Sequence, residues 1–128
     1  MMGFKDRGAE EDWDVLKEVN PYLAAILFYA GCRAEKYGLD ILITSIFRQD
    51  GSIHNFWEGA DCRLRHDNEG EMNLAHWQEI TNDINAQFEF GGVRHDDVDT
   101  HVCHIRLAEL GHHDDPMNDH VHFQARRH

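Results

Sequence analysis

The chain has 128 residues, with 24 acidic and 12 basic side chains and a formal charge of −12 at pH 7. This excess of negative charge disfavours nucleic acids and anionic membrane surfaces as partners, because like charges repel. No apolar run reaches the roughly 18 residues that a membrane span needs, and the N-terminal residues lack the apolar region of a secretory signal. We therefore expect a protein without a membrane span that stays in the cytoplasm or is released by lysis of the cell.

The length suits a single domain. Residues 1–12 are densely charged, so we expect a loosely ordered N-terminal segment followed by one domain over 13–128. Asn20 is a favourable helix N-cap and Pro21 suits the first helical position, which predicts a helix that ends near Gly38. One apolar stripe at three- and four-residue spacing marks its buried face: Leu23, Leu27, Ala30, Ala34 and Tyr37.

The rest of the chain mixes strand and helix signals without strict βαβ alternation. Short segments rich in β-branched or alternating apolar residues predict four strands, and one longer periodic segment predicts a second helix. We therefore expect the α+β class, with a small, mainly antiparallel sheet and two main helices. The predicted strands span 40–47, 59–65, 100–107 and 120–125, and the second helix spans 73–88 with Leu74, Trp77, Thr81, Ile84 and Phe88 on its inner face.

The three cysteines, Cys32, Cys62 and Cys103, stand at unrelated spacings and include no Cys-x-x-Cys pair. An odd count of this kind argues against a disulfide framework and against a thiolate metal site. We expect free thiols that are mostly buried.

Candidate metal ligands stand out among the 11 histidines because of their spacing. His54 and Asp61 are close in the chain, and His120 and His122 lie on one face of the last predicted strand together with Gln124. Two imidazoles and a carboxylate are ligands that zinc accepts, and three protein ligands with one open position are typical of a catalytic site. The ordinary interpretation of the late pair is a solvent-facing strand surface.

Two other groupings of histidines and carboxylates are weaker candidates, because such segments are more often simply solvated. They are His101 and His104 with Asp97 or Asp99, and the run His112, His113, Asp114 and Asp115.

Two motifs carry a family resemblance. The segment Ile43-Thr44-Ser45, Arg48, Ser52-x-His54-x6-Asp61 and the later Asp119-x-x-His122-Phe123-Gln124 resemble the zinc DD-peptidases of the M15 family. That family includes D-alanyl-D-alanine carboxypeptidases and dipeptidases and L-alanyl-D-glutamate endolysins, and the hedgehog signalling domain shares its fold. Its motifs run Ser-x-His-x-x-Gly-x-Ala-x-Asp and Glu-x-x-His or Asp-x-x-His. The resemblance covers roughly residues 20–125 and implies a hedgehog/DD-peptidase fold.

The resemblance implies a role for each matching position. His54, Asp61 and His122 would hold Zn²⁺, and Asp119 would be the catalytic carboxylate that transfers the proton. His120 is a second candidate for proton transfer or substrate contact.

Arg48 would lie near the carboxylate of the substrate or its polarised carbonyl, and Ser52 would order the loop before the first ligand. The chain departs from the family at Trp57, Gly59 and Val121, where the motifs have glycine, alanine and tryptophan. Trp57 could form a wall of a substrate pocket or narrow it.

The function implied by the resemblance is a zinc-dependent peptidase that hydrolyses an amide bond in a short peptide. A peptidoglycan stem peptide with D-amino acids is the expected substrate, in a carboxypeptidase, dipeptidase or endolysin type of reaction. One alternative is a non-catalytic metal-binding domain of the same fold, serving as a phage structural part or binding module. Another is a zinc hydrolase of a non-peptide substrate, because fold and metal do not fix the substrate.

Overall fold

The sheet is mixed and five-stranded, in the order β1-β2-β3-β5-β4. The computed structural model describes residues 2–64, 70–92, 101–111 and 119–127. β1 pairs with β2 in parallel, and the other neighbouring strands pair antiparallel. The α+β class predicted from the sequence is therefore confirmed. The strands are β1 Met2–Phe4, β2 Ile41–Ser45, β3 Gly59–Arg63, β4 Cys103–Arg106 and β5 His120–Gln124.

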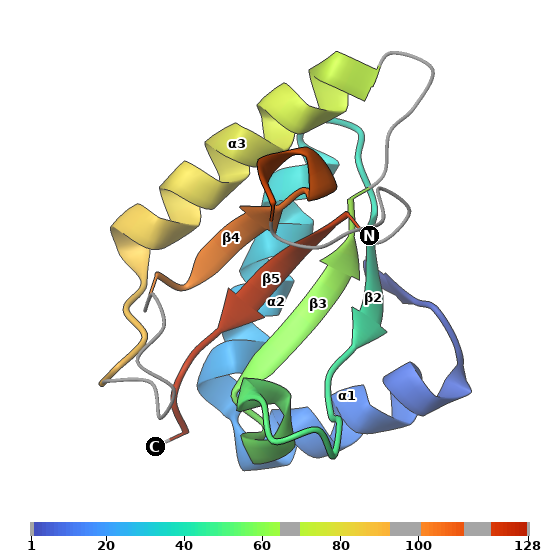
Figure 1. Ribbon diagram of the computed structural model, residues 1–128, viewed down its shortest axis with the longest axis vertical. Helices are drawn as coiled ribbons and strands as arrows, with labels where there is room; N and C mark the ends of the chain where they lie inside the picture. Colours follow the sequence, from blue (N-terminus) through green and yellow to red (C-terminus); the bar gives the residue numbers. More distant parts are fainter. Residues whose placement is uncertain (1, 65–69, 93–100, 112–118, 128) are drawn as a thin grey trace.

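Three α-helices accompany the sheet in the described part of the chain, one more than the two expected. In Figure 1, α2 lies behind the sheet, α1 runs across the bottom of the view past the ends of β2 and β3, and α3 runs beside β4. One face of the central strands is therefore covered by helices, and two short 3₁₀ helices lie on the other side (Figure 1). The helices are α1 Arg7–Val19, α2 Pro21–Glu35, α3 Gly70–Gln87, η1 Ile53–Phe56 and η2 Ala108–Leu110.

The described residues of the N-terminal segment form regular secondary structure, where the charged composition predicted a loosely ordered segment over 1–12. Residues 2–4 form β1, and α1 begins at Arg7. Asp6 caps this helix, because its carboxylate accepts a hydrogen bond from the backbone N–H of Ala9 at 2.9 Å. Ala9 and Leu16 are buried, and the ring of Phe4 packs on Trp13. A capping residue and a few apolar contacts thus order a segment whose composition is mostly charged.

The core lies between the helices and the inner face of the sheet. Strand alternation turns every second residue of β3 and β5 toward the helices, and these residues have no exposed surface. The apolar stripe predicted on the first helix is buried as expected, and Tyr37 packs against its edge beyond the helix end. The inner set comprises Ala60, Cys62, Val121 and Phe123 from the strands, Leu23, Leu27, Ala30 and Ala34 from α2, and Trp77, Ile80 and Ile84 from α3.

Asn20 connects the helices to the sheet. Its side-chain oxygen accepts from the backbone N–H of Leu23 at 3.2 Å and so caps α2, as the sequence predicted. Its amide group donates to the carbonyl oxygens of Trp57 and Ala125, both at 2.9 Å. Asn20 has no exposed surface. One buried amide therefore fixes the start of α2 against the end of η1 and the end of β5.

Within the described residues, no helix combines the length and the apolar character that crossing a membrane requires.

The thiols of Cys62 and Cys103 should be unreactive in the folded protein. Burial raises the pKa of Cys62 well above its ordinary value and raises the pKa of Cys103 to about 12. At pH 8 neither forms the thiolate that reacts with disulfide reagents. Because Cys32 is exposed, we expect one fast-reacting thiol in a colorimetric thiol assay under native conditions. The assay should report all three cysteines after unfolding in guanidinium, and rapid native reaction of more than one would contradict this.

Replacing Asn20 with alanine should destabilise the fold. The variant loses a helix cap and leaves one buried and one partly buried carbonyl group without this donor, at a cost of ~3 kcal/mol in the free energy of unfolding. Urea denaturation followed by circular dichroism measures this cost. Asn82→Ala on the exposed side of α3 is the matched control and should change stability by less than about 0.5 kcal/mol.

Candidate metal centre

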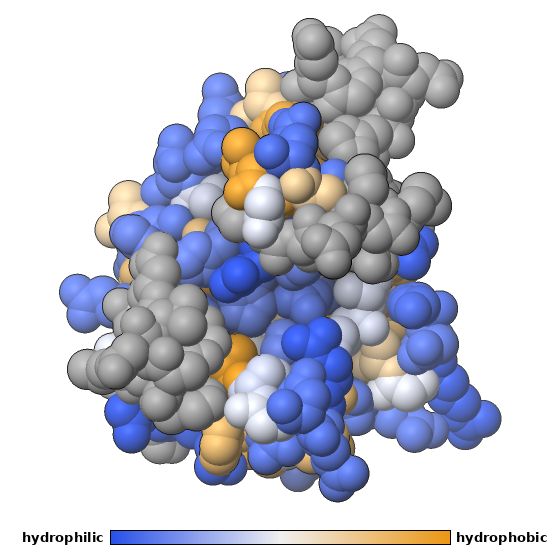
Figure 2. All heavy atoms as spheres, in the orientation of Figure 1, coloured by the Kyte–Doolittle hydropathy of each residue, from blue (hydrophilic) through white to orange (hydrophobic). Residues whose placement is uncertain are grey.

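The register of β3 against β5 brings together two of the three predicted ligands. Asp61 on β3 is the direct partner of His122 on β5. Directly opposed residues of an antiparallel pair project from the same face of the sheet. This is the face opposite to α1 and α2, and Figure 2 shows a hollow lined by mostly hydrophilic side chains over β3 and β5.

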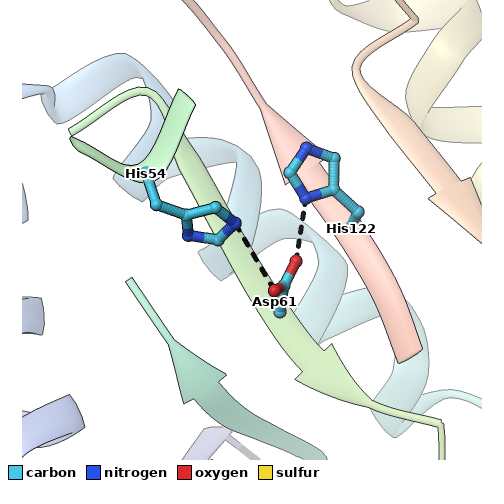
Figure 3. A group of neighbouring side chains, drawn as sticks. All are labelled: His54, Asp61 and His122. Atoms are coloured by element: carbon cyan, nitrogen blue, oxygen red, sulfur yellow. Dashed lines mark hydrogen bonds and ion pairs between the residues drawn. The ribbon is translucent and has the colours of Figure 1, made fainter. Parts of the chain in front are cut away.

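The third ligand, His54, comes from η1, which covers one end of this face (Figure 3). The side-chain oxygen of Ser52 accepts from the backbone N–H of His54 at 3.2 Å and caps the short helix. The Ser52 hydroxyl in turn donates to the carboxylate of Asp50. Ser52 therefore orders the loop before the first ligand, the role that the family resemblance implied for it.

Trp57 ends η1 in a left-handed backbone conformation, with φ 60° and ψ 32°. Glycine adopts this conformation without strain, whereas a side chain with a Cβ disfavours it. The Trp57 ring stacks on Phe47, with ring centroids 4.7 Å apart, and packs against the core. This stacking and core packing offset the unfavourable backbone conformation.

His54, Asp61 and His122 form one compact group (Figure 3). One ligand atom from each lies within 4.8 Å of the others. His122 Nδ1 lies 2.8 Å from Asp61 Oδ1, and His54 Nε2 lies 3.4 Å from Asp61 Oδ2. All three are buried, with exposed fractions of 1%, 6% and 5% in chain order. The two sequence motifs thus converge on a single buried point.

His54 Nε2 is a buried nitrogen without a hydrogen-bond partner among the described residues. Its other ring nitrogen, Nδ1, lies 2.9 Å from the carbonyl oxygen of Ile46. A carbonyl only accepts, so Nδ1 carries the hydrogen and the neutral ring has its lone pair on Nε2. That lone pair faces the carboxylate of Asp61, and two acceptors at this separation require a cation between them. A metal ion or an added proton would meet this requirement.

The electrostatics of the group favour a cation. Burial alone would raise the pKa of Asp61, but the neighbouring imidazoles of His122 and His54 outweigh burial and hold it well below its ordinary value. Asp61 is therefore an anion at neutral pH. Burial lowers the pKa of His122, against the opposing pull of Asp61. Lower basicity leaves the ring neutral, which is the form that binds a metal.

The donor set indicates which ions would fit. Two imidazole nitrogens and one carboxylate suit zinc with an open fourth position, and they also match the facial arrangement that binds iron(II). Magnesium and calcium prefer oxygen ligands throughout. The residues therefore fit a first-row transition ion.

The other predicted site residues lie at different distances from this group. Arg48 Nη1 is 3.4 Å from Asp61 Oδ2, and the Arg48 guanidinium also pairs with Asp50 at 3.0 Å. His120 Nε2 lies 3.8 Å from Asp61 Oδ1, on the face of the sheet that carries the ligands. The carboxylate of Asp119 accepts instead from the backbone N–H of Ala108, at 2.9 Å, where η2 begins. The structure therefore brings Arg48 and His120 to the group and shows Asp119 bonded to η2.

Gly59 is a site residue whose importance the sequence pattern did not reveal. A Cβ at this position would lie 2.7 Å from Ile53, 3.3 Å from the ring of His54 and 3.4 Å from the ring of His122. Only glycine lets η1 and β5 approach β3 this closely. Its place in the motif, where the family has alanine, was the one available signal.

The weaker metal groupings are not supported by the described residues. Within the described ranges, His54, Asp61 and His122 are the only group with metal-binding geometry. Asp97, Asp99 and the run 112–115 lie outside those ranges.

Comparison with known proteins adds no relative to these observations: no protein-family model, no curated protein and no solved structure matches the chain.

Replacing Gly59 with alanine should weaken metal binding without removing a ligand. The new methyl group would push the rings of His54 and His122 apart, and overpacking of this kind costs about 1–3 kcal/mol of stability. We expect metal affinity to fall by at least tenfold in competition titrations with a chromophoric chelator. Gly31→Ala is the matched control, because a Cβ there makes an ordinary contact of 3.7 Å with Ile41. Equal affinities in the two variants would contradict the close packing at Gly59.

Proposed function

We propose that this chain is a zinc-dependent peptidase that hydrolyses an amide bond in a short peptide, with a peptidoglycan stem peptide containing D-amino acids as the substrate. The observation that carries the proposal is the convergence of His54, Asp61 and His122 at one buried point, with a nitrogen of His54 that has no hydrogen-bond partner among the described residues. The motif resemblance to the M15 peptidases, and to their hedgehog/DD-peptidase fold, supplies the reaction class.

His54, Asp61 and His122 would hold the zinc ion, which supplies Lewis acidity and makes a bound water acidic enough to act as a nucleophile near neutral pH. The protein holds these ligands rigidly, because His54 is fixed by Ile46 and Asp61 lies within the paired strands. The hollow over β3 and β5 (Figure 2) offers a place for an extended peptide.

His120 is the residue that we assign to proton transfer, in preference to Asp119. Its Nε2 atom is 3.8 Å from Asp61, and its side chain is about one quarter exposed, so it reaches both the ligand group and solvent. An imidazole can accept a proton from water and then return it to the leaving amine. The carboxylate of Asp119 is engaged with η2. Asp119 is therefore assigned to holding η2 in place.

Arg48 would stabilise the negative charge that develops on the carbonyl oxygen. Its guanidinium lies beside Asp61 and is about two-fifths exposed, so it can turn toward a bound substrate. A preorganised positive charge at this point lowers the energy of the transition state more than that of the ground state.

The test combines metal content and hydrolysis. Purified protein is loaded with zinc, and metal content is measured by mass spectrometry. Dipeptides and stem-peptide fragments with L,D- and D,D-linkages are then assayed for newly formed amines. His54→Ala should lose both zinc and hydrolysis. His120→Asn should keep zinc and lose roughly 100- to 10,000-fold in turnover, the range expected for removal of a general acid–base group.

Control variants separate the loss of zinc or catalysis from a loss of stability. His76→Asn, a substitution on α3 where the ring stacks on Tyr37, should change neither zinc content nor turnover. Asp119→Asn should lower stability more than turnover. Retained zinc and hydrolysis in His54→Ala would exclude the proposed centre. Zinc binding without hydrolysis of any peptide would favour a non-catalytic metal-binding domain or a non-peptide substrate.

A further inference from the structure

We propose that Gln124 is a positioning residue for the metal centre, which fixes the hydrogen of His122 on Nε2 and leaves Nδ1 to bind the metal. This inference rests on the metal site of the proposed function and not on peptide hydrolysis. Gln124 follows His122 by two residues on β5 and so projects from the same face of the sheet. It has no exposed surface.

The orientation of the Gln124 amide follows from its contact with residue 101. Gln124 Nε2 lies 2.7 Å from the backbone carbonyl oxygen of His101. A carbonyl oxygen accepts hydrogen bonds and cannot donate, so the group that faces it must be the NH₂ of the amide. The amide oxygen is thereby turned in the other direction, toward His122.

The amide oxygen then decides the tautomer of His122. Gln124 Oε1 lies 3.0 Å from His122 Nε2. Because this oxygen is an acceptor, Nε2 must carry the hydrogen. A neutral imidazole has one such hydrogen, so the lone pair is on Nδ1. Nδ1 lies 2.8 Å from Asp61 Oδ1, within hydrogen-bonding distance, so either a hydrogen or a metal ion bridges these two atoms. With a metal ion bound, the single hydrogen of the neutral ring would stay on Nε2, opposite Gln124, and the lone pair of Nδ1 would face the metal.

The two histidine ligands are therefore fixed by the same kind of contact, which involves Nδ1 in His54 and Nε2 in His122. The carbonyl of Ile46 holds the hydrogen of His54 on Nδ1, and Gln124 holds the hydrogen of His122 on Nε2. In each case an oxygen behind the ring directs the lone pair of the other nitrogen toward Asp61. Such partners of a histidine ligand typically contribute about 10- to 100-fold to metal affinity.

Two variants distinguish a purely structural role of Gln124 from a role in positioning His122. Gln124→Met fills a similar volume but removes the hydrogen bonds of the amide to His101, His104 and His122. Gln124→Glu keeps an oxygen acceptor for His122 and loses the donor to His101. If the residue only held the fold together, both variants should be impaired to a similar extent. If it positions His122, the glutamate variant should retain metal binding.

The experiment measures zinc affinity by chelator competition for the full-length wild type and both variants. It also uses long-range ¹H–¹⁵N spectra of the zinc-loaded proteins to identify the protonated ring nitrogen. We expect Gln124→Met to lose about 10- to 100-fold in affinity, and Gln124→Glu to lose less than Gln124→Met, because it keeps the acceptor for His122. The wild type and Gln124→Glu should show the hydrogen of His122 on Nε2. Thr81→Val, a buried polar substitution beside Cys103, is the control and should bind zinc as the wild type does.

Three outcomes would overturn the inference. They are wild-type affinity in a folded Gln124→Met variant, an equal loss of affinity in Gln124→Met and Gln124→Glu, and a hydrogen on Nδ1 of His122 in the zinc-loaded wild type. Circular dichroism and thermal melting verify that each variant is folded. The readouts are affinity and ring protonation, so a failure to hydrolyse peptides, which would contradict the proposed function, does not change them.

Discussion

The pairing of β3 with β5 in one register is the constraint on which the candidate site depends. It sets Asp61 opposite His122 and sets Arg63 opposite His120. A shift of one residue would turn the whole set of side chains of one strand to the other face of the sheet. The apolar residues of both strands fix the register, because only one pairing buries them against the helices. The site is thus a consequence of how the core packs.

Buried polar contacts hold the candidate metal ligands in place. Asn20 holds the start of α2 to the end of η1, and Trp57 ends η1 in a left-handed conformation. These contacts hold η1, and with it His54, over the sheet. The centre is left with a buried carboxylate between two imidazoles and with a nitrogen, His54 Nε2, that has no hydrogen-bond partner among the described residues. The same contacts that stabilise the fold therefore create an affinity for a positive ion.

Part of the fold could be predicted from local pattern. The buried stripe of α2 follows from periodicity and is confirmed. The alternation in β5 places Val121 and Phe123 in the core as expected, but His122 and Gln124 on the opposite face are buried as well, so the interpretation as a solvent-facing surface was wrong there. The order of the N-terminal segment could not be predicted in this way. Its charged composition suggests a loose chain, whereas the pairing of β1 with β2 depends on residues far along the chain. The cap at Asp6 is local, but it acts on a helix that the charged composition did not predict. The close packing of His54 and His122 against Gly59 could not be predicted either, because it depends on how η1 and β5 are placed in space.

The sequence by itself determined the kinds of ligands and their order: two imidazoles and a carboxylate at spacings that suit two strands and a turn. The tertiary structure decided which histidines meet Asp61, and it brought His120 Nε2 to 3.8 Å from the same carboxylate. It also decided which ring nitrogen each ligand presents, through Ile46 and Gln124. The physical reason is that hydrogen bonds and burial depend on distances in space, which spacing along the chain does not specify.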